Sequence, residues 1–178
     1  GVNGFTLTRN LSLSGVGVGT SPSTQANPNQ TYILPQGALS LIGNNTIAGN
    51  ITTSATTATR IVTQFGTTTI SGTVNMGAGQ DLQLTGNSIG SSIPSNTIIN
   101  TQIPLSSGGL LKLGQGTVIL SNDNNLFSGR VRLDAGTLRV ASGGALGTSI
   151  AADAIRFNNG TLEVRAEPAS IASFATKS

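Results

Sequence analysis

One twelve-residue phrase occurs three times in the last part of the sequence and constrains the fold more than any other feature. Its copies are LLKLGQGTVILS at residues 110–121, RVRLDAGTLRVA at 130–141 and AIRFNNGTLEVR at 154–165, at steps of 20 and 24 residues. Each copy holds an alternating apolar and polar run, a Gly-Thr pair and a second alternating run. Repetition at this spacing is typical of a supersecondary unit stacked on copies of itself.

The alternation within each copy predicts two short strands, with the apolar residues on one face. The aligned apolar positions are Leu111, Leu113, Val118 and Leu120, then Val131, Leu133, Leu138 and Val140, then Ile155, Phe157, Leu162 and Val164. We expect Gly116, Gly136 and Gly160 to turn the corners between strands, because glycine adopts positive φ without steric cost. The threonine after each glycine then begins the next strand.

These observations predict an all-β fold, a parallel β-helix or β-solenoid. Here a rung means one turn of the chain, of roughly 20–24 residues, and neighbouring rungs hydrogen-bond at about 4.8 Å. The length then corresponds to roughly eight rungs. An antiparallel sandwich also gives alternating strands with turns. It does not require the same phrase at one-rung spacing, so the β-helix is favoured.

We predict a single domain over residues 1–178. Pro22, Pro28 and Pro35 interrupt the pattern near the N-terminus, and Pro94 and Pro104 interrupt it again. The predicted segments are a less regular part or cap at 1–37, rungs at 38–86, an insertion or distorted rung at 87–108, the best-matched rungs at 109–165 and the start of a next rung at 166–178. Because both ends of the sequence fall inside patterned stretches, we expect a piece or a mature subunit of a longer protein.

Composition excludes several classes of function. The chain is 37% hydrophobic, which is enough for a core, and only 8% charged. It has no Cys and no His, so thiolate chemistry, disulfides, Ser-His-Asp machinery and imidazole metal sites are absent. No apolar run is long enough for a membrane-spanning helix. Nine basic against six acidic residues, without basic clusters, do not indicate nucleic-acid binding.

The acidic residues do not form a recognisable catalytic or metal site. They are Asp81, Asp123, Asp134, Asp153, Glu163 and Glu167. Glycoside hydrolysis needs two converging carboxylates, and in the rung alignment no two acids share a column. The NDNN run at residues 122–125 could offer oxygen ligands to Ca²⁺, but it favours a turn with Asx hydrogen bonds. We therefore expect a protein that is not an enzyme, with no catalytic residue, cofactor or metal.

One column of the alignment is a candidate contact surface. Lys112, Arg132 and Arg156 occupy equivalent outward positions in three successive rungs, which predicts a basic ladder about 10 Å long. Such a ladder could meet anionic sugars, lipopolysaccharide or the carboxylates of a partner. The alternative is a solvated face made tolerable by screening and by Asp134. The same alignment places Arg139 beside Glu163 as a surface ion pair.

Residues 111–147, LKLGQGTVILSNDNNLFSGRVRLDAGTLRVASGGALG, resemble the autotransporter-associated β-strand repeat. The matching residues are Lys112, Gly114, Gly116, Thr117, Leu120, Ser121, Asn125, Phe127, Gly129, Ala135, Gly136, Thr137, Leu138, Val140, Ala145, Leu146 and Gly147. Phe127 replaces the commoner Tyr, and Val118 stands for Leu. The resemblance covers about a fifth of the chain. It implies a right-handed parallel β-helix from the passenger of an autotransporter or a similar bacterial surface protein, outside the outer membrane, and no catalytic residue.

We therefore predict a non-catalytic structural or adhesive β-solenoid segment of a bacterial cell-surface or secreted protein. Its expected partners are a host or cell-surface ligand, a glycan, or copies of itself associated end to end or laterally. No nucleic acid and no transmembrane segment are expected. The alternative is a carbohydrate-binding or carbohydrate-active β-helix with a groove beside residues 87–108. A third reading is a toxin or protease passenger whose active part lies outside this segment.

Overall fold

The computed structural model describes residues 4–17, 37–86 and 95–165, and these residues form an all-β structure. Strands in the described part gather into three sheets, and neighbouring strands in each sheet run parallel. A single 3₁₀ helix, η1 (Gly143–Leu146), is the only helical element among these residues. The all-β, parallel-sheet architecture predicted from the repeated phrase is thus confirmed, and the antiparallel alternative is wrong.

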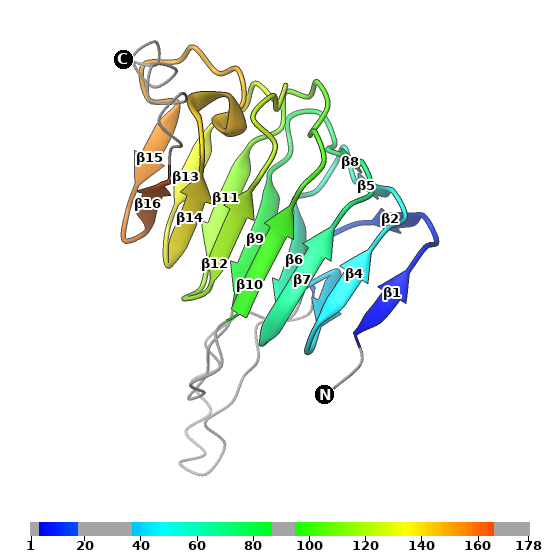
Figure 1. Cartoon of the computed structure of the whole chain (residues 1–178). Helices are drawn as coiled ribbons and strands as arrows, with labels where there is room; N and C mark the ends of the chain where they lie inside the picture. The colour runs from blue at the N-terminus through cyan, green and yellow to red at the C-terminus, as the bar shows by residue number, and fades with distance from the viewer. Residues whose placement is uncertain (1–3, 18–36, 87–94, 166–178) are drawn as a thin grey trace, which may run out of the picture.

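The largest sheet has seven strands, and their order in space follows their order in the sequence (Figure 1). They are β1 (Phe5–Leu7), β4 (Asn45–Ile47), β7 (Gly66–Ile70), β10 (Ser95–Ile99), β12 (Thr117–Leu120), β14 (Thr137–Val140) and β16 (Thr161–Val164). Each inner strand pairs with the strand of the preceding rung and that of the following rung, so this sheet records seven rungs. β1 and β16 lie at its two edges.

Two further sheets complete each rung. The six-stranded sheet contains β3 (Leu39–Leu41), β6 (Thr59–Thr63), β9 (Leu82–Gly86), β11 (Leu110–Leu113), β13 (Val131–Leu133) and β15 (Ile155–Phe157). The three-stranded sheet contains β2 (Leu11–Leu13), β5 (Ile51–Thr53) and β8 (Val74–Asn75). In its first half the chain visits the seven-, three- and six-stranded sheets in turn. After β10, turns and η1 take the place of the smallest sheet, which is consistent with a parallel β-helix.

Columns of aliphatic side chains fill the interior between the sheets. The clearest column runs along the seven-stranded sheet, where each member pairs in register with the next. Its members are Ile47, Ile70, Ile99, Leu120 and Val140, each at most 1% exposed. Full burial of one such side chain stabilises the fold by about 1.5–3 kcal/mol. Period-2 alternation in short strands is therefore sufficient to build the core.

The predicted alignment of the repeated phrase is confirmed in its second half. Thr117, Thr137 and Thr161 are register partners across β12, β14 and β16, and the apolar positions that follow them are aligned in the same way. The predicted Arg139–Glu163 pair also forms, with Nε of Arg139 2.9 Å from Oε2 of Glu163.

The alignment of the first half is wrong by one residue in the first copy. Leu110, not Leu111, pairs with Val131, and Lys112 pairs with Leu133. Leu133 lies four residues before the strand-starting Thr137, whereas Lys112 lies five before Thr117. Counted from these register partners to the next strand, the first copy therefore holds one residue more than the second, and the extra residue is Leu113 at the end of β11. One extra residue moves every side chain of β11 to the opposite face.

Glycines serve two purposes in this stack. Gly136 turns its corner at positive φ as predicted, but the positive-φ residue in the corner after β11 is Gly114 rather than Gly116. Gly116 and Gly160 do not have positive φ. Elsewhere, close stacking of rungs is the reason for glycine, because a Cβ atom on Gly72 would lie 2.1 Å from the carbonyl oxygen of Gly49.

The predicted segments are refined at both irregular regions. Within the expected cap at 1–37, β1 and β2 continue the sheets by pairing with β4 and β5, while residues 18–36 lie outside the described residues. Within the expected insertion at 87–108, residues 95–99 form the central strand of the seven-stranded sheet. Residues 87–94 and 166–178 lie outside the described part.

Candidate functional site

The predicted basic ladder of Lys112, Arg132 and Arg156 is only partly brought together by the fold. Arg132 and Arg156 are register partners on β13 and β15, as expected. Lys112 does not share their column, because its place beside Arg132 is taken by Leu111. Lys112 points inward and is 0% exposed, so its predicted outward position is wrong. The cause is the extra residue between Lys112 and Thr117, which turns Lys112 to the interior face.

The Lys112 ammonium lies against the two neighbouring corners of the stack. Nζ donates hydrogen bonds to the carbonyl oxygens of Leu113 at 2.7 Å, Gly114 at 2.8 Å and Ala135 at 3.1 Å. An ammonium has three donors, and these bonds use all of them. Burial lowers the pKa of Lys112 from 10.5 to about 8, because desolvation disfavours its charged form. This lysine joins two rungs and is not available as a surface contact.

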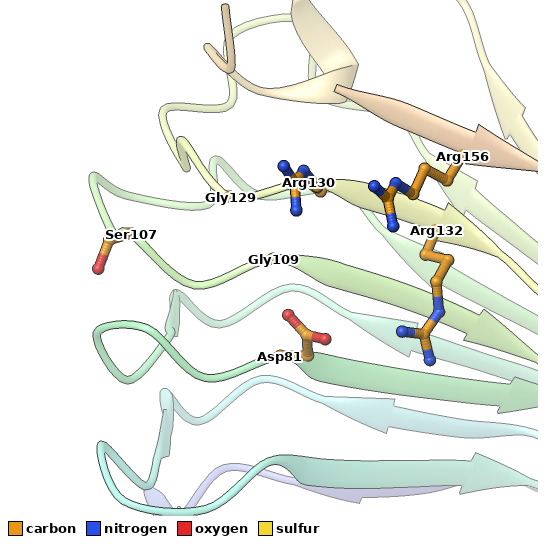
Figure 2. Close-up of a pocket in the computed structure, with 7 residues that line it drawn as sticks. All are labelled: Asp81, Ser107, Gly109, Gly129, Arg130, Arg132 and Arg156. Atoms are coloured by element: carbon orange, nitrogen blue, oxygen red, sulfur yellow. The ribbon is translucent and has the colours of Figure 1, made fainter. Parts of the chain in front are cut away.

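A different basic residue, Arg130, takes the place of Lys112 in the surface cluster. Arg130 immediately precedes β13 and lies with Arg132 and Arg156 around a depression of about 240 Å³ (Figure 2). The remaining lining residues are Asp81, Ser107, Gly109 and Gly129. These positions lie before or within β9, β11, β13 and β15, so four successive strands of the six-stranded sheet contribute to one site. We call this set the arginine hollow.

Two aspartates fix the direction of the three guanidinium groups. Nε of Arg130 lies 2.9 Å from Oδ1 of Asp153, and Arg156 donates to Oδ2 of the same carboxylate from Nε at 2.8 Å and from a terminal nitrogen. Nε of Arg132 lies 3.1 Å from Oδ1 of Asp134. The hydrogen bond from Arg156, aided by the charges of Arg130 and Arg156, holds the pKa of Asp153 below its usual value.

The side chains of the arginine hollow are accessible and still oriented. The side chains of Arg130 and Arg156 are 54% exposed and that of Arg132 is 44% exposed. In Figure 2 the Arg132 side chain runs from β13 past the level of Gly109 toward the level of Asp81. Its aliphatic part thereby lies near Leu111, its column neighbour, which points outward yet is only 3% exposed. The site therefore combines exposure with limited freedom of movement.

The asparagine-rich run at 122–125 is a structural turn, as favoured by the sequence. Oδ1 of Asn122 accepts a hydrogen bond from the backbone N–H of Asn124 at 2.9 Å, which is an Asx turn. The buried Asn125 accepts from the Ile103 N–H at 2.8 Å and donates to the Ala145 carbonyl at 2.8 Å. This side chain therefore bridges neighbouring rungs. Within the described ranges, no group of three or more His, Cys, Asp or Glu residues is placed to hold a metal ion.

Sequence reasoning found part of the arginine hollow and missed the rest. Arg132 and Arg156 were identified by the alignment of the repeated phrase, but Arg130 and Asp81 were not singled out as site residues. Arg130 sits one position before the first inward residue of β13, at the start of the second copy of the phrase. The repeated phrase alone could therefore have predicted that Arg130 lies beside Arg132. Asp81 lies before the first aligned copy, so its distance from the arginines depends on rung lengths that the phrase does not give.

Comparisons with known proteins give no independent identity. No protein-family model, curated protein or solved structure matches this chain. The resemblance to the autotransporter repeat therefore stays a prediction. Among the residues described, no helix has the length and apolar character needed to cross a membrane.

Proposed function

We propose that this chain is a segment of a right-handed parallel β-helix that acts as a stiff, non-catalytic rod in a bacterial cell-surface or secreted protein. The observation that carries the proposal is the in-register stacking of the Gly-Thr strands β12, β14 and β16. A chain that repeats one strand phrase and pairs each copy with the next grows along a single axis. Adhesion, surface display and assembly into a filament or layer all use such a rod.

The rod proposal is supported by how each rung is held. Parallel backbone hydrogen bonds join each inner rung to both neighbours in the seven-stranded sheet, and the aliphatic column beneath excludes water. Buried polar groups such as Asn125 add side-chain bonds between rungs. Bending would break several of these contacts at once. Repetition also suits adhesion, because weak identical contacts along one rod multiply through avidity.

Association between copies is part of the proposal. β1 and β16 each have one strand neighbour within the described residues, and an open strand edge is a template for another strand. At the edge formed by β15 and β16, Phe157 and Val164 occupy inward columns but are 57% and 45% exposed. These exposed apolar residues at the β15 and β16 edge support end-to-end association of the 178-residue chain.

The location and shape are tested together by labelling and imaging. An epitope tag inserted after the fully exposed Ile150 should leave the sheets intact. In cells that make the protein, we expect the tag antibody to label intact cells, and electron tomography to show labelled rods, filaments or a layer. A cytoplasmic protein carrying the same tag is the control for intact envelopes. Labelling only after permeabilisation would contradict the surface location, and compact particles would contradict the rod.

A further inference from the structure

The arginine hollow has a shape that the backbone itself maintains. Gly109 and Gly129 lie at the entrances of adjacent strands, where a side chain would fill the space. A Cβ atom on Gly109 would lie 2.5 Å from the Arg130 carbonyl oxygen and 2.7 Å from Oδ1 of Asp81. A Cβ atom on Gly129 would lie 2.4 Å from the carbonyl carbon of Gly108. Neither position accepts a larger residue without a shift of the stacked backbone, so the depression is a fixed feature of the rungs.

The polar groups of the hollow are of two kinds and lie on different rungs. Within the described residues, the hydrogen bonds of Arg130 and Arg132 to their aspartates use Nε. The terminal nitrogens of these two guanidiniums are therefore left to face other acceptors. Asp81 lies two rungs below, and Ser107 adds a hydroxyl on the intervening rung (Figure 2). In Figure 2 the guanidiniums of Arg130 and Arg156 lie at one end of the hollow, whereas that of Arg132 extends toward the level of Asp81. A ligand across the hollow would therefore meet two guanidiniums at one end, and a guanidinium with a carboxylate acceptor at the other.

This combination selects a class of ligand. Guanidinium groups bind carboxylate and sulfate oxygens through paired charge-assisted hydrogen bonds. The Asp81 carboxylate repels a second anionic group but accepts hydrogen bonds from hydroxyls. A simple inorganic anion satisfies only the arginine side, and a polyphosphate chain would bring charge against Asp81. An acidic sugar carries one anionic group and several hydroxyls on a compact ring, and so matches both ends.

We propose that the arginine hollow binds an acidic sugar residue of a polysaccharide, with its carboxylate or sulfate on Arg130 and Arg156 and its hydroxyls on Arg132 and Asp81. The isolated chain carries the whole hollow, so this proposal does not depend on the rod function. One exposed site gives weak binding, and a polymer of such sugars bound by many copies gains avidity. In the outward column that contains Arg132, the next two positions are Leu111 on β11 and Gln83 on β9. Neither is basic, so the arginines form a local site and not a continuous ladder.

The first test compares matched ligands on the complete 178-residue chain. Trigalacturonic acid and a sulfated heparin tetrasaccharide supply the two acidic groups, galactotriose supplies the neutral ring, and a short oligoglutamate supplies carboxylates without hydroxyls. Isothermal titration at low salt should show at least tenfold tighter binding of one or both acidic sugars than of galactotriose and oligoglutamate. Equal binding of oligoglutamate would reassign the site to an acidic protein partner. No binding of either acidic sugar would overturn the proposal.

The second test uses variants of the half-exposed arginines, which keep the core intact. Arg132→Gln should weaken acidic-sugar binding about tenfold, whereas Arg139→Gln should leave it unchanged. Arg139 is the matched control, since it is also ion-paired on a sheet surface but lies outside the hollow. Asp81→Asn should weaken sugar binding several-fold while strengthening binding of inorganic sulfate. Equal losses in the Arg132 and Arg139 variants would show non-specific attraction and refute the site.

Discussion

The buried Lys112 makes the stability of this protein depend on pH between about 8 and 10.5. Its folded pKa of about 8 lies below the value of 10.5 in the unfolded chain. Below pH 8 both states carry the charge, and the folded state bears the full desolvation cost. Between pH 8 and 10.5 the unfolded chain binds more protons than the folded chain, so the free energy of unfolding rises with pH. Above 10.5 both states are neutral and the penalty has gone.

The size of the effect follows from the shift. One pKa unit corresponds to about 1.4 kcal/mol, so a shift from 10.5 to about 8 gives roughly 3 kcal/mol of added stability across the window. The side chain is 0% exposed, so the shift belongs to a group that folding removes from solvent. The three carbonyl contacts stabilise the ammonium, and they limit the shift without reversing it.

The perturbation that isolates the effect is Lys112→Met, which keeps the length and removes the charge. At neutral pH the variant loses the donors to three carbonyls, each worth about 1–3 kcal/mol when left without a partner, and gains back the desolvation cost. The informative quantity is therefore the difference between the two proteins as a function of pH. We expect the parent to exceed the variant by about 3 kcal/mol more at pH 10.5 than at pH 7.5.

The composition of the chain makes this measurement clean. Tyr32 is the only Tyr and Lys177 is the only Lys besides Lys112, and the sequence has no His or Cys. When Tyr32→Phe and Lys177→Met are placed in both proteins, Lys112 of the parent is the one Lys, Tyr, His or Cys side chain that remains. These are the side-chain types that titrate in or near the range from pH 8 to 10.5. Urea unfolding followed by circular dichroism at several pH values gives the two curves. A difference that stays constant across this window would refute the reasoning.

Three further predictions concern the core, the stacking and the ion pairs. Leu133→Ala should lower the free energy of unfolding by about 2–5 kcal/mol, whereas Phe157→Ala, in the same column but 57% exposed, should cost roughly 1 kcal/mol in the same urea assay; equal costs would contradict the difference in burial between the two side chains. Gly72→Ala should destabilise by roughly 1–3 kcal/mol, seen as a lower urea midpoint, because its Cβ would lie 2.1 Å from a carbonyl oxygen of the adjacent rung. Arg156→Gln should raise the pKa of Asp153 in a carboxyl NMR titration, because it removes the main hydrogen bond that lowers it, and Asp153 should then contribute less to the loss of native stability on acidification; an unmoved pKa would contradict the pairing.

The sequence was sufficient to predict the parallel stacking because the repeated phrase carries its own register marker. The Gly-Thr pair appears once in each copy, and the strand that follows begins at the threonine in β12, β14 and β16. A marker at each strand start fixes the alignment without any knowledge of loop lengths. The Arg139–Glu163 pair followed correctly from this alignment.

The same reasoning failed on β11 because the pattern there is ambiguous. Leu110, Leu111 and Leu113 place apolar residues at both parities, so either face could have been read as the interior. Register is set by pairing with β9 and β13, which lie 20 or more residues away along the chain. The sequence also does not predict Asp81 as part of the arginine hollow, because Asp81 reaches it only through the pairing of β9 with β11.

The extra residue between Lys112 and Thr117 explains both why a lysine faces the interior and why the fold accepts it. The extra residue turns Lys112 inward, where an unpaired charge would cost far more than the fold can offset. The same extension places the carbonyls of Leu113 and Gly114 beside Nζ, and the Ala135 carbonyl of the next corner completes the set. Surface charge is thereby lost at this rung, and the basic character of this face rests on Arg130, Arg132 and Arg156 instead. In a stacked-rung protein, then, one extra residue between two register-paired positions decides which charged residues become structural and which stay available to a ligand.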